Sequence, residues 1–188
     1  MVATKPGPEL IDPTGTTSGH VLTSTGGSTA PTFQQGGRIV QVVNTQTGSM
    51  ATGTALWSDD NSIPQISEGT EFMTLAITPA NSSNKLLIIT DSNWGSSVAT
   101  IYIMAAIFQD ATTNALVTAQ QVTHSGTNNH MHLSFSHYMT AGTTSSTTFR
   151  FRAAAHTGPT TITFNGVGGA QKGGGIMASS MTIMEIET

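Results

Sequence analysis

Residues 71–90 read EFMTLAITPANSSNKLLIIT, and they decide the class of fold. Polar and apolar side chains alternate from Glu71 to Thr78, which predicts a β-strand, and Pro79 ends it. The polar stretch 81–84 predicts a turn. The apolar run at 85–90 follows directly and is typical of a buried strand.

Similar patterns recur along most of the chain. They predict further strands at 38–43, 99–109, 115–118, 131–139, 147–154, 160–164 and 176–186. The run at 99–109 also fits a buried helix by periodicity, but its β-branched and aromatic residues and the turn signal at 110–114 favour a strand. Short strands separated by turn signals predict an all-β fold, an antiparallel jelly-roll-like sandwich.

The composition agrees with an all-β protein and excludes several functions. Thr and Ser number 33 and 19 among the 188 residues, while only 9% are charged and the net charge is −4. A nucleic-acid partner is not expected, because clustered Lys and Arg are missing. Membrane insertion is not expected either, because no apolar stretch approaches the ~18–20 residues of a membrane span. The chain has no cysteine, so it has no disulfides, and no cofactor is indicated.

Residues 1–37 differ from the rest of the chain. They contain four prolines, seven glycines and few large apolar residues, so they cannot bury a core of their own. We predict an extended attachment arm or linker over 1–37 and a sandwich head domain over 38–188.

The last predicted strand indicates self-association. Its 176–184 portion is apolar on both faces, and such a strand has to be covered on both. One face would meet the core, and the other would meet a neighbouring subunit, as in a cyclic trimer. Met177, Met181 and Ile183 are the candidate interface residues.

Several segments resemble bacteriophage tail-fibre and related virion proteins. Residues 15–33, GTTSGHVLTSTGGSTAPTF, are similar to short segments of such fibres, although Phe33 stands where Trp is more usual. The pieces 77–89, 106–110 and 181–187 resemble the small globular heads that follow those segments. The resemblance implies a trimeric head of the C1q-like or TNF-like kind, with a structural or adhesive role and no catalysis.

The leading hypothesis is therefore a non-enzymatic virion protein, a short tail fibre or tail-tip fibre that contributes to host-surface attachment. Residues 1–37 would contact other virion proteins, and the head would meet a host glycan or protein. The alternative is a head fibre or capsid decoration protein on the capsid surface. A glycan depolymerase and an unrelated lectin-like module are the further hypotheses.

Two groups of residues are candidates for binding. His130 and His132 form an H-x-H pair that shares one face of a strand, so three copies around an axis would offer six nitrogens to a metal ion. The other interpretation is a pair of surface or interface histidines. For receptor binding, the loops 91–97 and 123–129 provide Trp94 for stacking, together with Asn93, His124 and Asn128. Trp94 would otherwise be a core residue.

Arg150 and Arg152 alternate with Phe149 and Phe151. The phenylalanines should face the core and the arginines the other side. Two parallel guanidinium groups could hold an acidic sugar or a carboxylate, but an ion pair between subunits or a solvated face is favoured.

Overall fold

The computed structural model describes residues 20–23, 32–35, 37–126 and 128–188. The chain divides into two units, Met1–Arg38 and Ile39–Thr188. In the first unit, β1 (His20–Thr23) pairs antiparallel with β2 (Thr32–Gln35). The remainder of the predicted arm, apart from Gly37, lies outside the described residues, so its role as an attachment segment stays a prediction.

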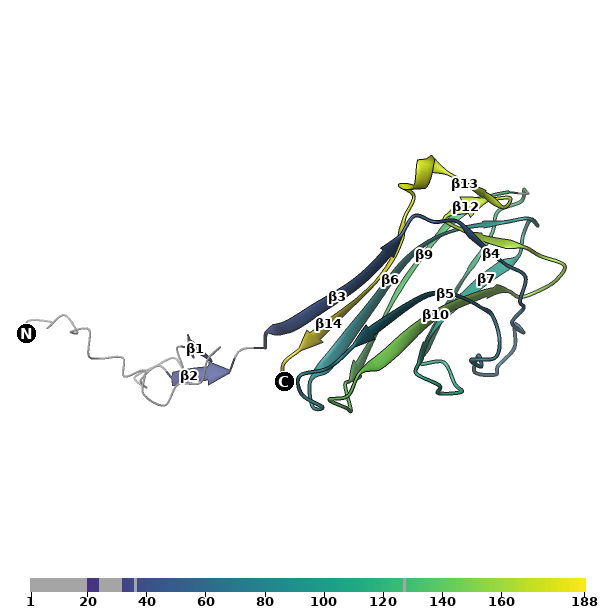
Figure 1. The fold of residues 1–188 in the computed structure, drawn as a ribbon. Coiled ribbons are helices and arrows are strands. Elements are labelled where there is room, and N and C mark those ends of the chain that lie inside the picture. The colour runs from purple at the N-terminus through teal and green to yellow at the C-terminus, as the bar shows by residue number, and fades with distance from the viewer. Residues whose placement is uncertain (1–19, 24–31, 36, 127) are drawn as a thin grey trace, which may run out of the picture. The chain divides into compact units, whose positions relative to one another are not determined.

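The second unit is an antiparallel β-sandwich, which confirms the predicted fold class (Figure 1). One sheet has four strands, in the order β5 (Thr70–Ile77), β10 (Thr147–Ala155), β7 (Tyr102–Gln109) and β8 (Val117–Val122). The other has six, namely β3 (Ile39–Thr47), β14 (Ser179–Ile186), β6 (Lys85–Ser96), β11 (Ile162–Phe164), β4 (Ala51–Gly53) and β9 (His130–Thr140), the last pairing with β6. β12 (Gly166–Val167) and β13 (Ala170–Gln171) form a small hairpin, and a 3₁₀ turn follows at Gly173–Gly175. The described residues contain no α-helix, and none of their elements is a helix able to cross a membrane.

An aromatic cluster fills the space between the sheets. The Trp94 ring lies 4.8 Å from Phe72 in an edge-to-face arrangement and 5.0 Å from Phe164, measured between centroids. The indole Nε1 donates to the Ser92 hydroxyl at 2.8 Å, and that hydroxyl donates to the Leu133 carbonyl at 2.7 Å. Because every polar atom of this group has a partner, the tryptophan is buried at little electrostatic cost.

A second, smaller core explains the ambiguous pattern at 99–109. Trp57 and Phe108 pack on the outer face of the four-stranded sheet, with ring centroids 6.4 Å apart. Met104, Ala106 and Ala154 complete that core, while Ile103, Ala105 and Ile107 face the main core. β7 is thus covered on both faces, and a strand covered on both faces loses its alternation.

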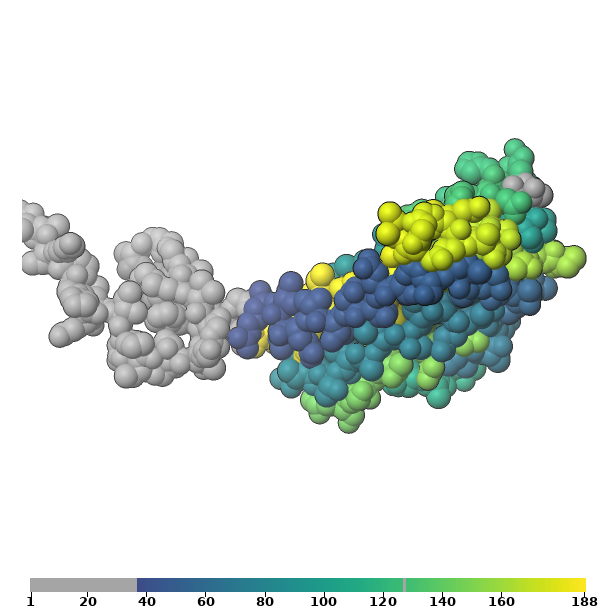
Figure 2. Space-filling view, turned by 45° about the horizontal axis from the view of Figure 1, so that its top comes forward, coloured from purple at the N-terminus to yellow at the C-terminus, as the bar shows by residue number. Residues whose placement is uncertain are grey.

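Several strand boundaries differ from the predictions, and β8 runs to Val122 beyond the predicted end at 118. β3 continues to Thr47, and β6 continues to Ser96, so most of the predicted loop 91–97 is strand. β14 begins only at Ser179, and the residues before it form the glycine-rich loop after β13, which Figure 2 shows on the surface. The short strand β4 has no clear signal in the sequence.

A buried carboxylate joins the last strand to the turn between β5 and β6. Glu185 is fully buried. Its carboxylate accepts hydrogen bonds from Gln41 Nε2 and Asn84 Nδ2, both at 2.6 Å, and from the backbone N–H groups of Ala80 at 2.9 Å and Asn81 at 3.3 Å. Burial alone would raise the pKa of Glu185, but these hydrogen bonds outweigh it and hold the pKa below its ordinary value.

The strand register defines two ends of the sandwich. At one end, Ile186 pairs with both Ile39 and Lys85, and Lys85 pairs with Thr140 on its other side. We call this the stem end, because the preceding unit joins at Ile39. At the other end, Ser179 pairs with Thr47. β3 has nine residues between these ends, which is about 30 Å of strand.

We expect Glu185→Gln to lower the free energy of unfolding by about 2–3 kcal/mol. The glutamine NH₂ group is a donor, and it would face N–H groups that now donate to the carboxylate. The stabilisation from Glu185 is present above its unfolded pKa and is lost as pH falls through the lower folded pKa. The substitution should therefore remove a decline in stability below about pH 4.5, the ordinary pKa of the group. Urea unfolding between pH 3 and pH 7, on the order of one pH unit per step, measures this.

Asp59→Asn is the matched control, because Asp59 is an exposed carboxylate. It should leave both the stability and its pH profile unchanged. A Glu185→Gln protein as stable as the unsubstituted one would contradict the role of this carboxylate.

His137 is a separate source of pH dependence, because burial lowers its pKa. The loss of stability that its protonation causes should persist in both variants.

Candidate functional site

Trp94 is a core residue with 1% of its surface exposed. The prediction that it is an exposed stacking residue on a loop is wrong, and the alternative of a core position holds. The physical reason is the alternation of β6, which places Ser92 and Trp94 on the inner face and Asp91 and Asn93 on the outer face.

Asn93 also has a structural role. Its side chain donates to the Ala178 carbonyl at 2.9 Å, and its backbone N–H donates to the Ser179 hydroxyl at 3.0 Å. These bonds hold the beginning of β14 against β6.

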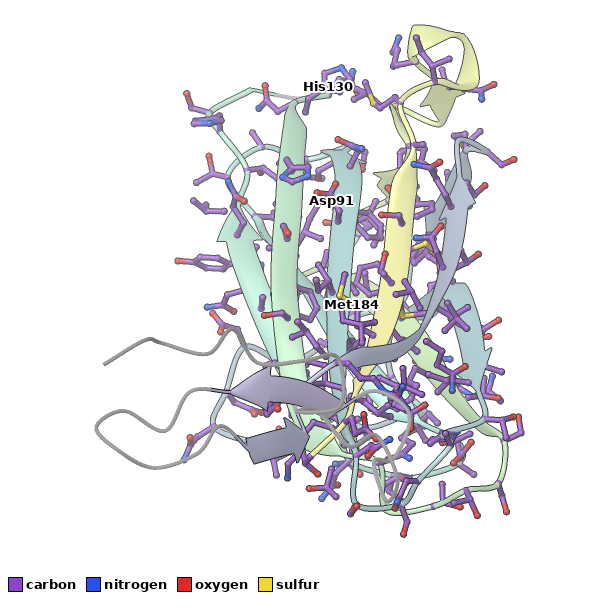
Figure 3. All side chains as sticks on the ribbon, turned by 90° about the vertical axis from the view of Figure 1, so that its left-hand side faces the viewer. Asp91, His130 and Met184 are labelled. Carbon is purple, nitrogen blue, oxygen red and sulfur yellow. The ribbon has the colours of Figure 1, made fainter. Side chains whose placement is uncertain are left out.

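The H-x-H pair lies on the outer face of the six-stranded sheet, as the strand period predicts. His130 and His132 are both exposed, and His132 Nε2 lies 2.7 Å from Asp91 Oδ1. Figure 3 labels His130 and Asp91 on this face. They line an open hollow with Asn93, Met131 and Met177. Among the described residues, no group of three or more His, Asp or Glu side chains is placed to hold a metal ion, so a metal here stays a prediction that needs further copies of the chain.

Two of the three predicted interface residues point the wrong way. Met181 and Ile183 are fully buried in the core, and only Met177 is partly exposed. The strand does carry apolar residues on both faces, but the outward ones are Met184 and Ile186. A one-residue error in assigning the inner face exchanges the two sets of side chains.

An apolar row crosses the outer face of the six-stranded sheet at Met184. The register pairs Tyr138 with Leu87, Leu87 with Met184, and Met184 with Val42. Tyr138 is 55% exposed and Val42 53%, and Leu87 and Met184 are half-buried. Figure 3 looks onto this face, with β9, β6, β14 and β3 side by side. Sequence reasoning missed the row, because it depends on pairings between four strands.

The loops at the end away from Ile39 gather several polar residues, and we call this the loop end. Two segments of the loop end are tied together by the bond from the Thr100 N–H to the His124 carbonyl (3.1 Å) and that from the Asn128 N–H to the Ser96 carbonyl (3.0 Å). The predicted residues His124 and Asn128 are therefore brought to one place, whereas Trp94 and Asn93 are not part of it. Both His124 and Asn128 are exposed.

A pocket of about 310 Å³ opens at the loop end beside Asn128. Its lining consists of Ser97, Asn128, Thr161, Thr163, Gly168 and Gly169. Only Asn128 of these was a predicted binding residue. Ser97 lies at the end of the predicted binding loop 91–97 but was not singled out, and the others belong to segments for which no binding role was predicted.

The arginine pair is occupied within the chain. Arg150 Nη1 and Arg152 Nη1 lie 3.1 and 3.3 Å from the same carboxylate oxygen of Glu71 on β5. Arg152 also donates to the carbonyls of Glu68 and Gly69, at 3.0 and 2.8 Å. Phe149 and Phe151 are fully buried, as predicted. The ion pair was expected between subunits, but its partner Glu71 lies in the same chain, and the guanidinium groups are not an open site for an acidic ligand.

Comparison with known proteins identifies no family. No protein-family model matches the chain, and no curated protein matches it. Among solved structures, a chain of the structure of the infectious bursal disease virus Gx strain is similar in part. The match covers 89% of this chain and 41% of that chain, at 10% identity and a TM-score of 0.38. Tailspike protein 4 of bacteriophage CBA120, an enzymatically active domain, overlaps 69% of this chain and 20% of its own, at 17% identity and a TM-score of 0.24.

The insecticidal delta-endotoxin Cry8Ea1 of Bacillus thuringiensis overlaps to a similar degree, with 69% of this chain and 23% of its own, at 12% identity and a TM-score of 0.34. The chain spans about two fifths or less of the length of these proteins. Such overlaps decide neither family nor activity, and the fold described above rests on the strand pairing.

We expect Trp94→Ala to lower the free energy of unfolding by about 3–5 kcal/mol, because it leaves a cavity among Phe72, Phe151 and Phe164. Chemical denaturation measures the change. Ile176→Ala is the control, because Ile176 is 88% exposed, and it should change stability by about 0.5 kcal/mol or less.

Both tryptophans, Trp57 and Trp94, are 1% exposed, so the native protein should also show blue-shifted tryptophan emission that acrylamide quenches poorly. Red-shifted emission would contradict the burial of both.

Proposed function

We propose that this chain is a non-enzymatic structural protein of a bacteriophage virion, the trimeric head of a short tail fibre or tail-tip fibre that contributes to attachment at the host surface. The observation that carries the proposal is the apolar row on the outer face of the six-stranded sheet. The segments that resemble tail-fibre proteins support the same conclusion from the sequence.

The apolar row is a feature that a solitary domain would not be expected to keep in water. Exposed apolar residues are common when they are scattered, but a contiguous row across four strands is typical of an interaction surface. No charged side chain belongs to the row. Ile89 and Ile186 lie on the same face in the neighbouring rows, where Ile89 pairs with Thr182 and Ile186 pairs with Lys85. A face that is apolar at its centre and polar along its margins has the composition of a subunit interface.

The occupant that fits this face is a second copy of the same chain. Four strands about 4.8 Å apart and about 30 Å long present a flat area of about 600 Å². This approaches the ~800 Å² that each partner contributes to a standard interface. A symmetric oligomer would cover the row on every subunit at once, which a single unrelated partner would not do.

The two ends of the sandwich suit a fibre head. The segment before Ile39 joins at the stem end, and residues 1–37 would dock there to other virion proteins. The loop end lies about 30 Å away along β3 and carries the loops that tolerate variation. In this arrangement the loop end is presented to the host surface, and no nucleic acid or membrane insertion is involved.

We expect the chain to be a trimer of about 58 kDa, three copies of 19.5 kDa, and Met184→Lys to dissociate it, because three lysines would be brought into an apolar interface. Light scattering after size exclusion at micromolar concentration measures the mass. Gln120→Lys is the matched control, an exposed strand position on the other sheet, and should stay trimeric. A stable monomer before any substitution would refute the trimer.

We expect antibody labelling in electron micrographs to place the protein on the tail of the particle.

A chain beginning at Arg38 should keep the trimeric head and fail to be incorporated into the particle, because the attachment segment is missing. Labelling over the capsid would favour the head-fibre or decoration alternative, and aggregation of the shortened chain would show that the boundary at residue 38 is wrong.

A further inference from the structure

The pocket at the loop end is built from four separate segments of the chain. Ser97 follows β6, Asn128 precedes β9, Thr161 and Thr163 lie at β11, and Gly168 and Gly169 form the turn between β12 and β13. In Figure 1 the β12–β13 hairpin lies at the end of the sandwich opposite the C-terminus. The pocket therefore lies at the end that the proposed fibre head would present.

The lining of the pocket has one chemical character. It offers the hydroxyl groups of Ser97 and Thr161, one carboxamide and the backbone of two glycines, while Thr163 is fully buried, and it contains no charged, aromatic or large aliphatic side chain. The lining has no cationic group for an anion, no carboxylate for a metal ion and no apolar surface for a lipid. Hydroxyl and carboxamide groups both donate and accept hydrogen bonds, which matches a ligand that is itself covered with hydroxyl groups.

The lining is held in place before any ligand arrives. The Thr161 N–H donates to the Ser97 hydroxyl at 2.9 Å, and the Ser97 N–H donates to the Thr161 carbonyl at 3.0 Å. The Gly169 N–H donates to the Thr163 hydroxyl at 3.1 Å. The Ser97 oxygen accepts from the backbone, so its own hydrogen stays available to a ligand, whereas the fully buried Thr163 hydroxyl serves to hold the glycine turn. A pre-organised site loses less conformational entropy on binding.

Asn128 occupies an unusual position in the pocket. Its φ is 61°, in the left-handed region that costs a non-glycine residue free energy. Its side chain is exposed and makes no hydrogen bond within the part of the chain that the structure describes. Across the pocket, a Cβ at Gly168 would lie 2.9 Å from Asn128 Oδ1, so a glycine there leaves room for the carboxamide. The carboxamide thus lies beside the hollow, next to Gly168.

We propose that this pocket binds a neutral sugar residue of a host-surface glycan, with Asn128 and the hydroxyls of Ser97 and Thr161 as the hydrogen-bonding groups. The inference rests on the proposed function, since it assigns a ligand class to the end that would face the host. A single pocket of this size, without an aromatic platform, binds weakly. Three pockets per trimer and several trimers per particle would raise the avidity.

The test uses the full chain and two variants that remove ligand contacts without removing a hydrogen bond of the fold. Asn128→Gly deletes the carboxamide at a position where glycine is the better backbone residue. Thr161→Val deletes a hydroxyl that has no partner among the described residues, and it keeps the backbone bonds to Ser97. The matched controls are Thr100→Gly, which also has a positive φ of 53°, and Thr157→Val, because both are exposed positions at the same end.

The probes are the methyl glycosides of glucose, galactose and N-acetylglucosamine, followed by saturation-transfer NMR, with inorganic phosphate as the anionic comparison. At least one glycoside should bind with a Kd in the millimolar range. Asn128→Gly and Thr161→Val should each raise that Kd about fivefold, as expected when one hydrogen bond is lost, and the two controls should leave it unchanged.

Three results would overturn the assignment: no binding of any glycoside, binding that neither pocket variant weakens, or stronger binding of phosphate than of the glycosides. The position of the protein on the particle and its trimeric mass are measured separately. A failure of the sugar site would leave those results intact, and a particle without this protein would refute the proposed function while the sugar binding of the isolated chain stood.

Discussion

The fold depends on the buried carboxylate of Glu185, which is held by neutral donors. Glu185 lies near the end of the last strand, yet it accepts hydrogen bonds from β3 and from the turn that carries the chain from one sheet to the other. An unpaired carboxylate in this position would cost several kcal/mol, so the strand and the turn are stable only together. The crossing from β5 to β6 is thereby coupled to the correct docking of the first and last strands of the head.

The class of fold was predictable from the sequence, because alternation and turn residues act locally. The strand at 71–78, the turn at 81–84 and the buried phenylalanines Phe149 and Phe151 follow from that pattern. The inner face of β14 was not predictable, since Thr182, Met184 and Ile186 are nearly as apolar as the residues opposite them. In the structure, Glu185 lies on the inner face with Met181 and Ile183, where it meets its donors.

The candidate binding residues show the same division between local and non-local information. The shared face of His130 and His132 follows from the strand period, whereas Asp91 beside His132 follows from the register of β6 with β9. Trp94 was misplaced because Asn, Ser and Gly around it are typical of loops. In the structure, Ser92 serves as the partner of the indole, and Gly95 is required because a Cβ there would lie 2.6 Å from the Gly166 carbonyl oxygen.

The exposed surfaces of the sandwich differ in chemical character between the middle of the six-stranded sheet and the loop end. The middle of the six-stranded sheet is apolar and belongs to strands whose register is fixed, so it can be covered only by a rigid surface of similar shape. The loop end is polar and consists of short segments tied together by backbone hydrogen bonds, so single side chains there can change without disturbing the sheets. The proposed association and the proposed sugar recognition could therefore vary independently, because no residue of the apolar row also lines the pocket.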